Sequence, residues 1–170
     1  MQSSEQFAHK AHQGQQRKYT GEPYIVHPER VAGIVKTVTD DPATIDAAWL
    51  HDVVEDTPFT LEQIRLEFGD EVAKLVDEVT NVTKKTDGNR AHRKSVERQH
   101  LATASPKAKT VKLADVIDNV TDIMRNDRDF ATVFVPEKLE LLNFLTEGDP
   151  VLFKQARELI FDSLLELGLN

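Results

Sequence analysis

Asp41-Pro-Ala-Thr-Ile-Asp-Ala-Ala-Trp-Leu-His-Asp-Val-Val-Glu-Asp-Thr57 is the stretch that says most about how this chain folds. Asp41 followed by Pro42 is a typical helix start, because aspartate caps free amide groups and proline suits the first helical position. Apolar residues then recur at three- and four-residue spacing, namely Ile45, Ala48, Trp49 and Val53. This spacing predicts a helix with one face buried in the core.

The same predicted helix carries four titratable side chains in its last turns: His51, Asp52, Glu55 and Asp56. Residues three or four apart lie on neighbouring faces of a helix, so we expect these groups to lie close together. Burying them beside an apolar stripe costs free energy unless a partner neutralises them, and a divalent metal ion would be such a partner. The competing interpretation is a solvated acidic helix end.

Composition limits the classes of function. A chain of 170 residues is long enough to bury a core, and we expect one domain over residues 1–170. Cysteine is absent, which excludes disulfides and thiolate metal sites and leaves histidine and carboxylate to bind zinc, manganese, iron or magnesium. A net charge of −8 argues against nucleic-acid binding but not against a small anionic substrate. No apolar run resembles a signal peptide or a membrane span, so we expect no membrane partner and a cytoplasmic protein.

The sequence pattern predicts that the rest of the chain is also helical. We expect helices over about residues 3–14, 28–38, 60–69 and 72–83, a polar loop over 84–93, and a helix to about 104. Ser105-Pro106 starts another helix that carries residues 107–119, residues 126–130 form a turn, and two amphipathic helices follow. The one short strand-like run is Tyr24-Ile25-Val26. The chain is therefore predicted to be all-α.

Two more residues qualify as metal ligands. His27 lies in a loop between Val26 and Pro28, where a histidine can equally be structural. Asp115 interrupts the apolar set of its helix, and a carboxylate among apolar positions needs a partner. Two imidazoles and two carboxylates would suit one divalent metal ion with open positions for water.

Three stretches carry a more specific pattern, and they are Arg17-Lys-Tyr with Pro23-Tyr-Ile-Val-His-Pro28, Leu50-His-Asp-Val-Val-Glu-Asp-Thr57, and Val111-Lys-Leu-Ala-Asp-Val-Ile-Asp-Asn119. They resemble the HD superfamily of metal-dependent phosphohydrolases, and within it the hydrolase domain of the RelA/SpoT family and its stand-alone relatives, the small alarmone hydrolases. The resemblance runs through almost the whole chain. It implies an all-α, HD-domain helical bundle.

That family hydrolyses the 3′-pyrophosphate of hyperphosphorylated nucleotides such as (p)ppGpp, usually with manganese. The resemblance implies one divalent ion, Mn²⁺, held by His27, His51, Asp52 and Asp115. It implies that Glu55 and Asp56 are catalytic, as the acidic pair that orders and activates the attacking water. It further implies a set of substrate-binding residues, namely Arg17, Lys18, Lys112 and Asn119, while Phe134 stands near the place of a tyrosine that contacts the nucleoside.

The chain also departs from the family. Relatives commonly have a basic residue directly after the Asp ligand, whereas this chain has Val116, and Asp118 adds a negative charge. The base and the number of phosphates therefore stay open between (p)ppGpp and (p)ppApp, and so does the oligomeric state. A nucleotide phosphomonoesterase acting on substrates such as NADPH, and a non-catalytic nucleotide sensor, are the alternatives. We interpret the other histidines as surface or satisfied structural residues: His9, His12, His92 and His100.

Overall fold

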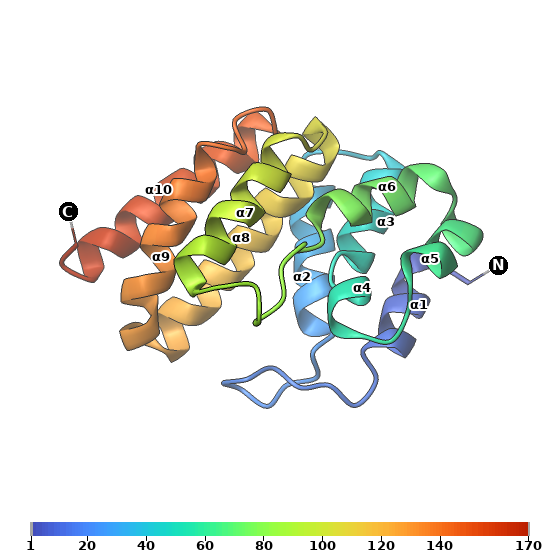
Figure 1. Cartoon of the computed structure of the whole chain (residues 1–170), viewed down its shortest axis with the longest axis horizontal. Helices are drawn as coiled ribbons and strands as arrows, with labels where there is room; N and C mark the ends of the chain where they lie inside the picture. Colours follow the sequence, from blue (N-terminus) through green and yellow to red (C-terminus); the bar gives the residue numbers. More distant parts are fainter. Residues whose placement is uncertain (1, 170) are drawn as a thin grey trace.

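The computed structural model describes residues 2–169, and this part of the chain forms ten α-helices (Figure 1). They are α1 (Ser4–Ala11), α2 (Val26–Lys36), α3 (Pro42–Leu50), α4 (Val53–Asp56), α5 (Leu61–Phe68), α6 (Asp70–Val79), α7 (Arg90–Ala102), α8 (Pro106–Asn126), α9 (Arg128–Leu142) and α10 (Pro150–Glu166). Within residues 2–169 the only strand-like pairing is one isolated antiparallel bridge between Gln16 and Pro23. The predicted all-α helical bundle is confirmed.

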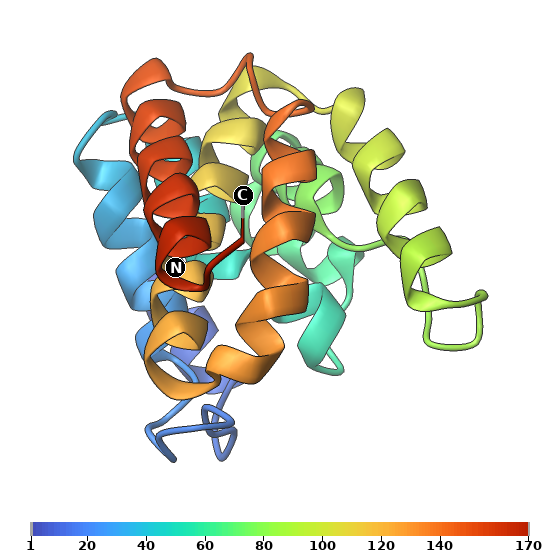
Figure 2. The same ribbon diagram turned by 90° about the vertical axis from the view of Figure 1, so that its left-hand side faces the viewer.

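Helix α8 holds the bundle together. It is 21 residues long and packs against α2, α3 and α6 on one side and against α9 and α10 on the other. Figures 1 and 2 show it between these two groups, with α9 and α10 covering it and α7 set off to the side. Buried positions recur along its whole length, from Ala108 to Ile123. A side chain in the middle of α8 is therefore enclosed by elements from both halves of the chain.

Most helix starts follow the predicted local chemistry. The Asp41 carboxylate accepts a hydrogen bond from the amide of Thr44 at 3.0 Å, and Pro42 occupies the first turn of α3. Ser105 caps α8 in the same way, again with a proline behind it. Thr60 and Gln63 form the reciprocal capping box predicted for α5. These helix starts are confirmed. They could be predicted from the sequence because capping depends on only a few neighbouring residues.

The prediction of one continuous helix through residues 41–57 is wrong. Helix α3 ends at Leu50, and α4 starts only at Val53, with Asp52 between them at φ −99° and ψ −5°. In an unbroken helix the carbonyl of Ala48 would accept the amide of Asp52. Here the Nδ1 atom of His51 lies 2.7 Å from that carbonyl oxygen and donates to it. The imidazole thus replaces a backbone donor, and the doublet His51-Asp52 forms the bend.

Two further boundaries differ from the prediction. Helix α7 begins at Arg90, earlier than the predicted end of the 84–93 loop, because the Asn89 side chain accepts the amide of His92 and caps it. The turn predicted over residues 126–130 shrinks to Asp127, and Phe130 lies in α9. Asp127 makes this possible because its backbone, at φ −150° and ψ 77°, breaks the helix while its carboxylate caps α9 through the amide of Phe130. Both differences come from side-chain caps.

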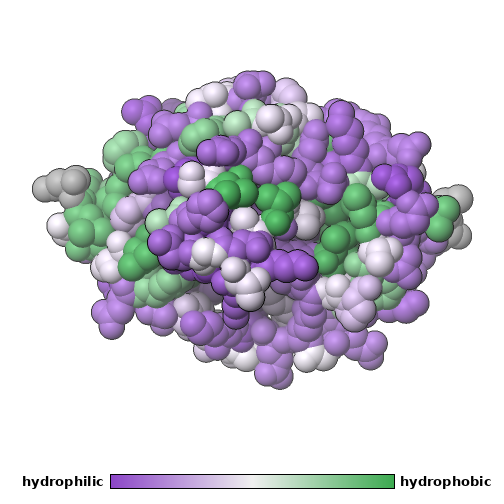
Figure 3. Space-filling view, in the orientation of Figure 1, coloured by the Kyte–Doolittle hydropathy of each residue, from purple (hydrophilic) through white to green (hydrophobic). Residues whose placement is uncertain are grey.

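The surface is mostly hydrophilic. Figure 3 shows apolar atoms on one face only as separate patches among polar ones. The large apolar side chains that are exposed lie on α5, α9 and α10 and on the α6–α7 connection, and they are Leu66, Val82, Val133, Val151, Phe161 and Leu165. Among the described residues, no helix combines the length and the apolarity that a membrane crossing requires.

Candidate functional site

Four of the predicted site residues meet at the centre of the bundle. His27 comes from the first turn of α2, His51 and Asp52 from the bend between α3 and α4, and Asp115 from the middle of α8. The two Nε2 atoms lie 3.3 Å apart. His51 Nε2 lies 3.0 Å from Asp52 Oδ2, and His27 Nε2 lies 3.1 Å from Asp115 Oδ1. The fold thus brings together donors that are as many as 88 positions apart in the sequence.

The spacing of these donors fits a divalent metal ion. One donor atom each from His27, His51 and Asp52 lies within 4.8 Å of the other two. Metal–ligand bonds of about 2.0–2.2 Å place neighbouring donors about 3.0–3.5 Å apart, which matches the Nε2 and carboxylate contacts here. Asp115 lies outside the compact group, and Lys112 and Asn119 each hold its carboxylate at 2.7 Å. Even so, its Oδ1 atom is within 3.6 Å of both imidazoles.

The outer nitrogens of both imidazoles are also engaged. His51 Nδ1 donates to the Ala48 carbonyl, and His27 Nδ1 donates to Asp118 Oδ2 at 2.6 Å. A proton fixed on Nδ1 leaves the lone pair of each Nε2 atom pointing into the cluster, as metal binding requires. Sequence reasoning missed this role of Asp118 and treated it as an extra negative charge. Its position three residues after Asp115, on the same face of α8, was the available signal.

The pKa values of the cluster show that it attracts positive charge. Burial alone would lower the pKa of His27, but hydrogen bonds to Asp115 and Asp118 raise it above its ordinary value. Burial likewise opposes the charged form of His51, and the adjacent Asp52 and Asp115 raise its pKa well above the ordinary range. Burial would raise the pKa of Asp52 and of Asp115, yet His51 lowers the first and Lys112 lowers the second. This donor set is a candidate divalent metal site.

The acidic pair lies at the mouth of this cluster. Glu55 is exposed, and Asn81 holds its carboxylate with two donors, Nδ2 to Oε1 at 2.9 Å and the amide to Oε2 at 3.3 Å. Asp56 accepts a hydrogen bond from the hydroxyl of Tyr24 at 3.3 Å. Burial, followed by repulsion from Asp52 and Glu55, raises the pKa of Asp56 to about 6. Asp56 therefore holds a proton at a pH where an ordinary aspartate is ionised.

Tyr24 connects the acidic pair to the candidate metal site. Its hydroxyl donates to Asp52 Oδ2 at 2.6 Å as well as to Asp56, and burial together with Asp52 raises its pKa. The ring of His12 packs on the ring of Tyr24 with their centroids 4.8 Å apart. His12 is buried, and only its Nδ1 atom has a partner within residues 2–169, the Gln15 side chain at 2.8 Å. The interpretation of His12 as a satisfied structural residue is thus only half right.

The predicted substrate-binding residues have different surroundings. Arg17 forms an ion pair with Asp122 at 2.8 Å and lies over the ring of Tyr24. Lys18 is exposed and lies over the ring of Tyr19. Arg17 and Lys18 therefore contact different residues. Lys112 and Asn119 both bind Asp115 directly.

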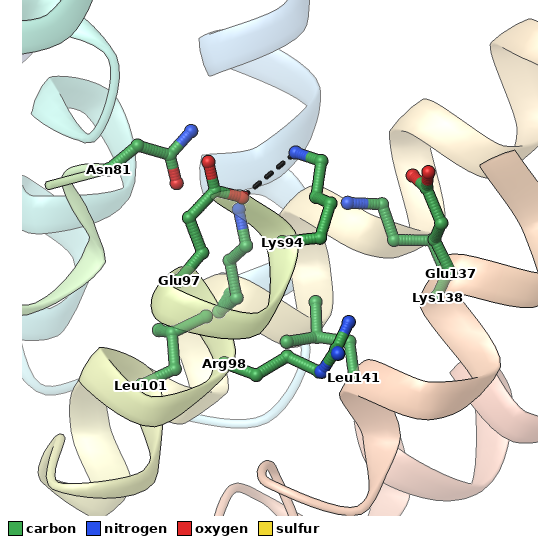
Figure 4. A pocket seen from close by; sticks show the side chains of 9 residues that line it. Asn81, Lys94, Glu97, Arg98, Leu101, Glu137, Lys138 and Leu141 are labelled. Carbon is green, nitrogen blue, oxygen red and sulfur yellow. Dashed lines mark hydrogen bonds and ion pairs between the residues drawn. The ribbon is translucent and has the colours of Figure 1, made fainter. Parts of the chain in front are cut away.

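A pocket adjoins the candidate metal site. It is small, with a cavity volume of about 40 Å³. Its lining contains four basic and two acidic side chains from α7, α8 and α9 (Figure 4), together with Asn81, Leu101 and Leu141. The charged ones are Lys94, Arg98, Lys112, Lys138, Glu97 and Glu137. Sequence reasoning did not identify Lys94 or Lys138 as site residues, because isolated lysines on amphipathic helices are usually solvated.

Comparison with known proteins finds one matching family and several similar proteins. The family described as "HD domain" matches residues 5–140. The chain is 40% identical over 137 residues to a Streptomyces coelicolor protein named GTP pyrophosphokinase, a match that covers 80% of the chain and 16% of that protein. It is 43% identical over 122 residues to the human guanosine-3′,5′-bis(diphosphate) 3′-pyrophosphohydrolase MESH1, covering 70% of the chain and 66% of that protein.

The first curated relatives are much longer than this chain, which spans only 16% to 21% of their lengths. A solved structure is similar over most of both molecules. It is described as a metazoan ortholog of SpoT that hydrolyzes ppGpp, and it superposes with a TM-score of 0.83 at 28% identity. The match covers 98% of the chain and 94% of that structure.

Proposed function

This chain belongs to the HD domain family, and we propose that it is a metal-dependent hydrolase that removes the 3′-pyrophosphate from a hyperphosphorylated nucleotide, (p)ppGpp or (p)ppApp. The observation that carries the proposal is the buried donor set of His27, His51, Asp52 and Asp115 beside a pocket rich in lysine. The names of the human relative and of an Aquifex aeolicus relative that is 44% identical over 124 residues support the reaction class. We further propose that residues 1–170 act as one catalytic unit.

We propose that His27, His51, Asp52 and Asp115 hold one divalent ion and that the ion is manganese. A mixed set of imidazole and carboxylate donors suits this metal. When bound, such an ion neutralises charge on a phosphoryl oxygen and lowers the pKa of water, which is the help that attack on a shielded phosphorus requires. Asp118 and the Ala48 carbonyl serve to keep the two imidazoles oriented.

The acidic pair supplies the proton chemistry. Glu55, held by Asn81, accepts the proton of the attacking water. Water oxygen bonds to the phosphorus that is attached to the ribose, and the bond from that phosphorus to the 3′ oxygen breaks. Pyrophosphate and the nucleoside 5′-di- or triphosphate are the products. Asp56, with a pKa of about 6, can carry a proton near neutral pH and return it to the leaving oxygen.

The basic residues bind substrate in this scheme. Arg17 and Lys18 lie on the loop before α2 and supply positive charge that a background of −8 lacks. Lys112 and Asn119 reach the substrate while also fixing Asp115. Burial disfavours the charged form of Lys112, but Asp115 raises its pKa, so its ammonium group stays charged at any physiological pH.

The test is product analysis by ion-exchange chromatography. The purified protein with Mn²⁺ is incubated separately with ppGpp, ppApp and NADPH, each with a chelator control and an Asp52→Ala control. We expect pyrophosphate from one of the two alarmones, abolished by either control, and the preferred substrate identifies the base. Release of phosphate from NADPH alone would make the protein a phosphomonoesterase. Binding without turnover of any of the three would make it a sensor.

A further inference from the structure

Lys138 is the one basic group lining the pocket that has no acidic partner within residues 2–169. Lys94 pairs with Glu97 at 2.8 Å, Arg98 with Glu140 at 3.2 Å, and Lys112 with Asp115 at 2.7 Å. The Nζ atom of Lys138 makes no hydrogen bond or ion pair there and lies 4.6 Å from the centre of the Phe134 ring. Glu137, the residue before Lys138 in α9, instead accepts two hydrogen bonds from Arg90.

The side chain of Lys138 reaches into the pocket between other ammonium groups. Figure 4 shows Lys94 and Lys138 extending into the same space from α7 and α9. Burial, followed by repulsion from Lys112 and Lys94, lowers the pKa of Lys138 to about 7. Lys94 and Lys112 have acidic partners, but Lys138 adds an ammonium group that has none among the described residues, and an anion beside it relieves the remaining repulsion. The pocket therefore favours a compact anion.

The place of the pocket shows which anion fits. At one wall Lys112 touches the candidate metal ligand Asp115, and at another Asn81 holds the candidate base Glu55. A phosphoryl group at the metal centre would thus have the pocket directly beside it. A group one bridging oxygen away from that phosphorus would lie among the lysines.

We propose that the pocket lined by Lys94, Lys112 and Lys138 binds the outer phosphoryl group of a pyrophosphate ester whose inner phosphoryl group lies at the metal centre. Lys138, the cation with no acidic partner, is then the residue that makes the site prefer pyrophosphate esters over phosphate monoesters. This inference rests on the proposed function and names the feature of the substrate that the site selects.

The first experiment measures binding by calorimetry with two probes, inorganic pyrophosphate and inorganic phosphate, in the Mn²⁺-loaded protein. Charge-assisted contacts of this kind change affinity by about 10- to 100-fold. We therefore expect Lys138→Met to weaken pyrophosphate binding about 10-fold or more and to change phosphate binding less than about twofold. Lys154→Met, at an exposed lysine on α10, is the control that should change neither. Equal changes for both probes, or none, would overturn the proposal.

A stability measurement separates binding from a structural role. Removing a partly buried ammonium without a partner should raise the melting temperature of the ligand-free protein, by about 2–4 °C. If Lys138→Met instead lowers it, Lys138→Arg keeps the charge and must restore the preference for pyrophosphate. Failure of Lys138→Arg to do so would overturn the proposal.

The two proposals can fail separately. If Lys138→Met weakens pyrophosphate binding selectively but the protein hydrolyses no pyrophosphate ester, the pocket assignment is supported and the proposed reaction is wrong. The opposite result is hydrolysis of ppGpp or ppApp together with an unchanged ratio, in Lys138→Met, of kcat/KM for a 3′-pyrophosphate to kcat/KM for a 3′-phosphate. In that case the proposed reaction is supported and the pocket assignment is wrong.

Discussion

Asp56 combines exposure to solvent with a carboxyl group whose pKa is raised to about 6. Although the residue as a whole is exposed, partial burial of its carboxyl group and the charges of Asp52 and Glu55 disfavour the ionised form. A carboxyl whose pKa is raised by folding contributes stability that is fully present below its unfolded pKa and is lost as the pH rises through its folded pKa. Ionised Asp56 therefore destabilises the metal-free protein above about pH 6.

We predict that Asp56→Asn raises the melting temperature of the chelator-treated protein at pH 8 and leaves it nearly unchanged at pH 4. Solvent screening at this exposed position keeps the gain below about 1 kcal/mol. Differential scanning fluorimetry at both pH values is the measurement, with Asp162→Asn on the exposed face of α10 as the control. An equal shift at both pH values would contradict the assigned cause.

Asp118 is predicted to act through His27. Its carboxylate holds Nδ1 of that imidazole at 2.6 Å and so sets which nitrogen faces the donor cluster. Loss of such an outer partner lowers metal affinity by about 10- to 100-fold. We expect Asp118→Ala to weaken Mn²⁺ binding by this factor in a competition titration against a fluorescent chelator, while Asp162→Ala leaves it unchanged. Wild-type affinity in Asp118→Ala would show that the hydrogen bond does not orient the ligand.

At the scale of elements, α7 differs from the helices around it. Of its 13 residues only Leu101 is buried, whereas α8 has eleven buried residues. Polar contacts attach α7 to its surroundings, among them Arg90 to Glu137 and Thr83 to Glu97. Such contacts are exposed to competition from water, so α7 is the helix best able to move away from the pocket and admit a ligand.

We predict that the backbone amides of α7 exchange with solvent faster than those of α8, and that pyrophosphate slows them. Hydrogen exchange followed by mass spectrometry measures both effects. Glu137→Gln, which weakens the pairing with Arg90, should speed exchange in α7 further, whereas Glu166→Gln at the surface pair with Arg128 should not. Protection of α7 equal to that of α8 would refute the idea that it moves.

The helices also show what the sequence could and could not predict. Starts such as Asp41-Pro42 and Ser105-Pro106 were predictable, because capping is decided within a few residues. The break at His51-Asp52 was not, because it depends on an imidazole turning back to the Ala48 carbonyl. The four candidate ligands could be named from residue type and resemblance. The role of Lys138 could not be predicted, since it depends on how α7, α8 and α9 pack. Asp118 could be placed on the same face of α8 as Asp115, but its contact with His27 depends on how α2 packs on α8.

At the scale of the whole molecule, a bound cation should stabilise the fold. A ligand at about 100 times its Kd adds about 2.7 kcal/mol to the free energy of unfolding, which for a chain of this size is roughly 5–10 °C in melting temperature. We expect Mn²⁺ to raise the melting temperature by that amount over the chelator-treated protein. His51→Ala should abolish the rise. A rise that persists in His51→Ala would place the ion elsewhere.

The arrangement of the donors along the chain has a consequence for the order of assembly. A contact between His27 and His51 closes a loop of 24 residues, but that between His27 and Asp115 closes one of 88. A nascent chain in which α8 has not yet been synthesised contains His27, His51 and Asp52. It lacks three residues of α8, namely Lys112, Asp115 and the Asp118 that orients His27. On the proposed ligand assignment, the complete ion site forms only after α8 has been synthesised and has docked on α2, and ion uptake would report that docking event.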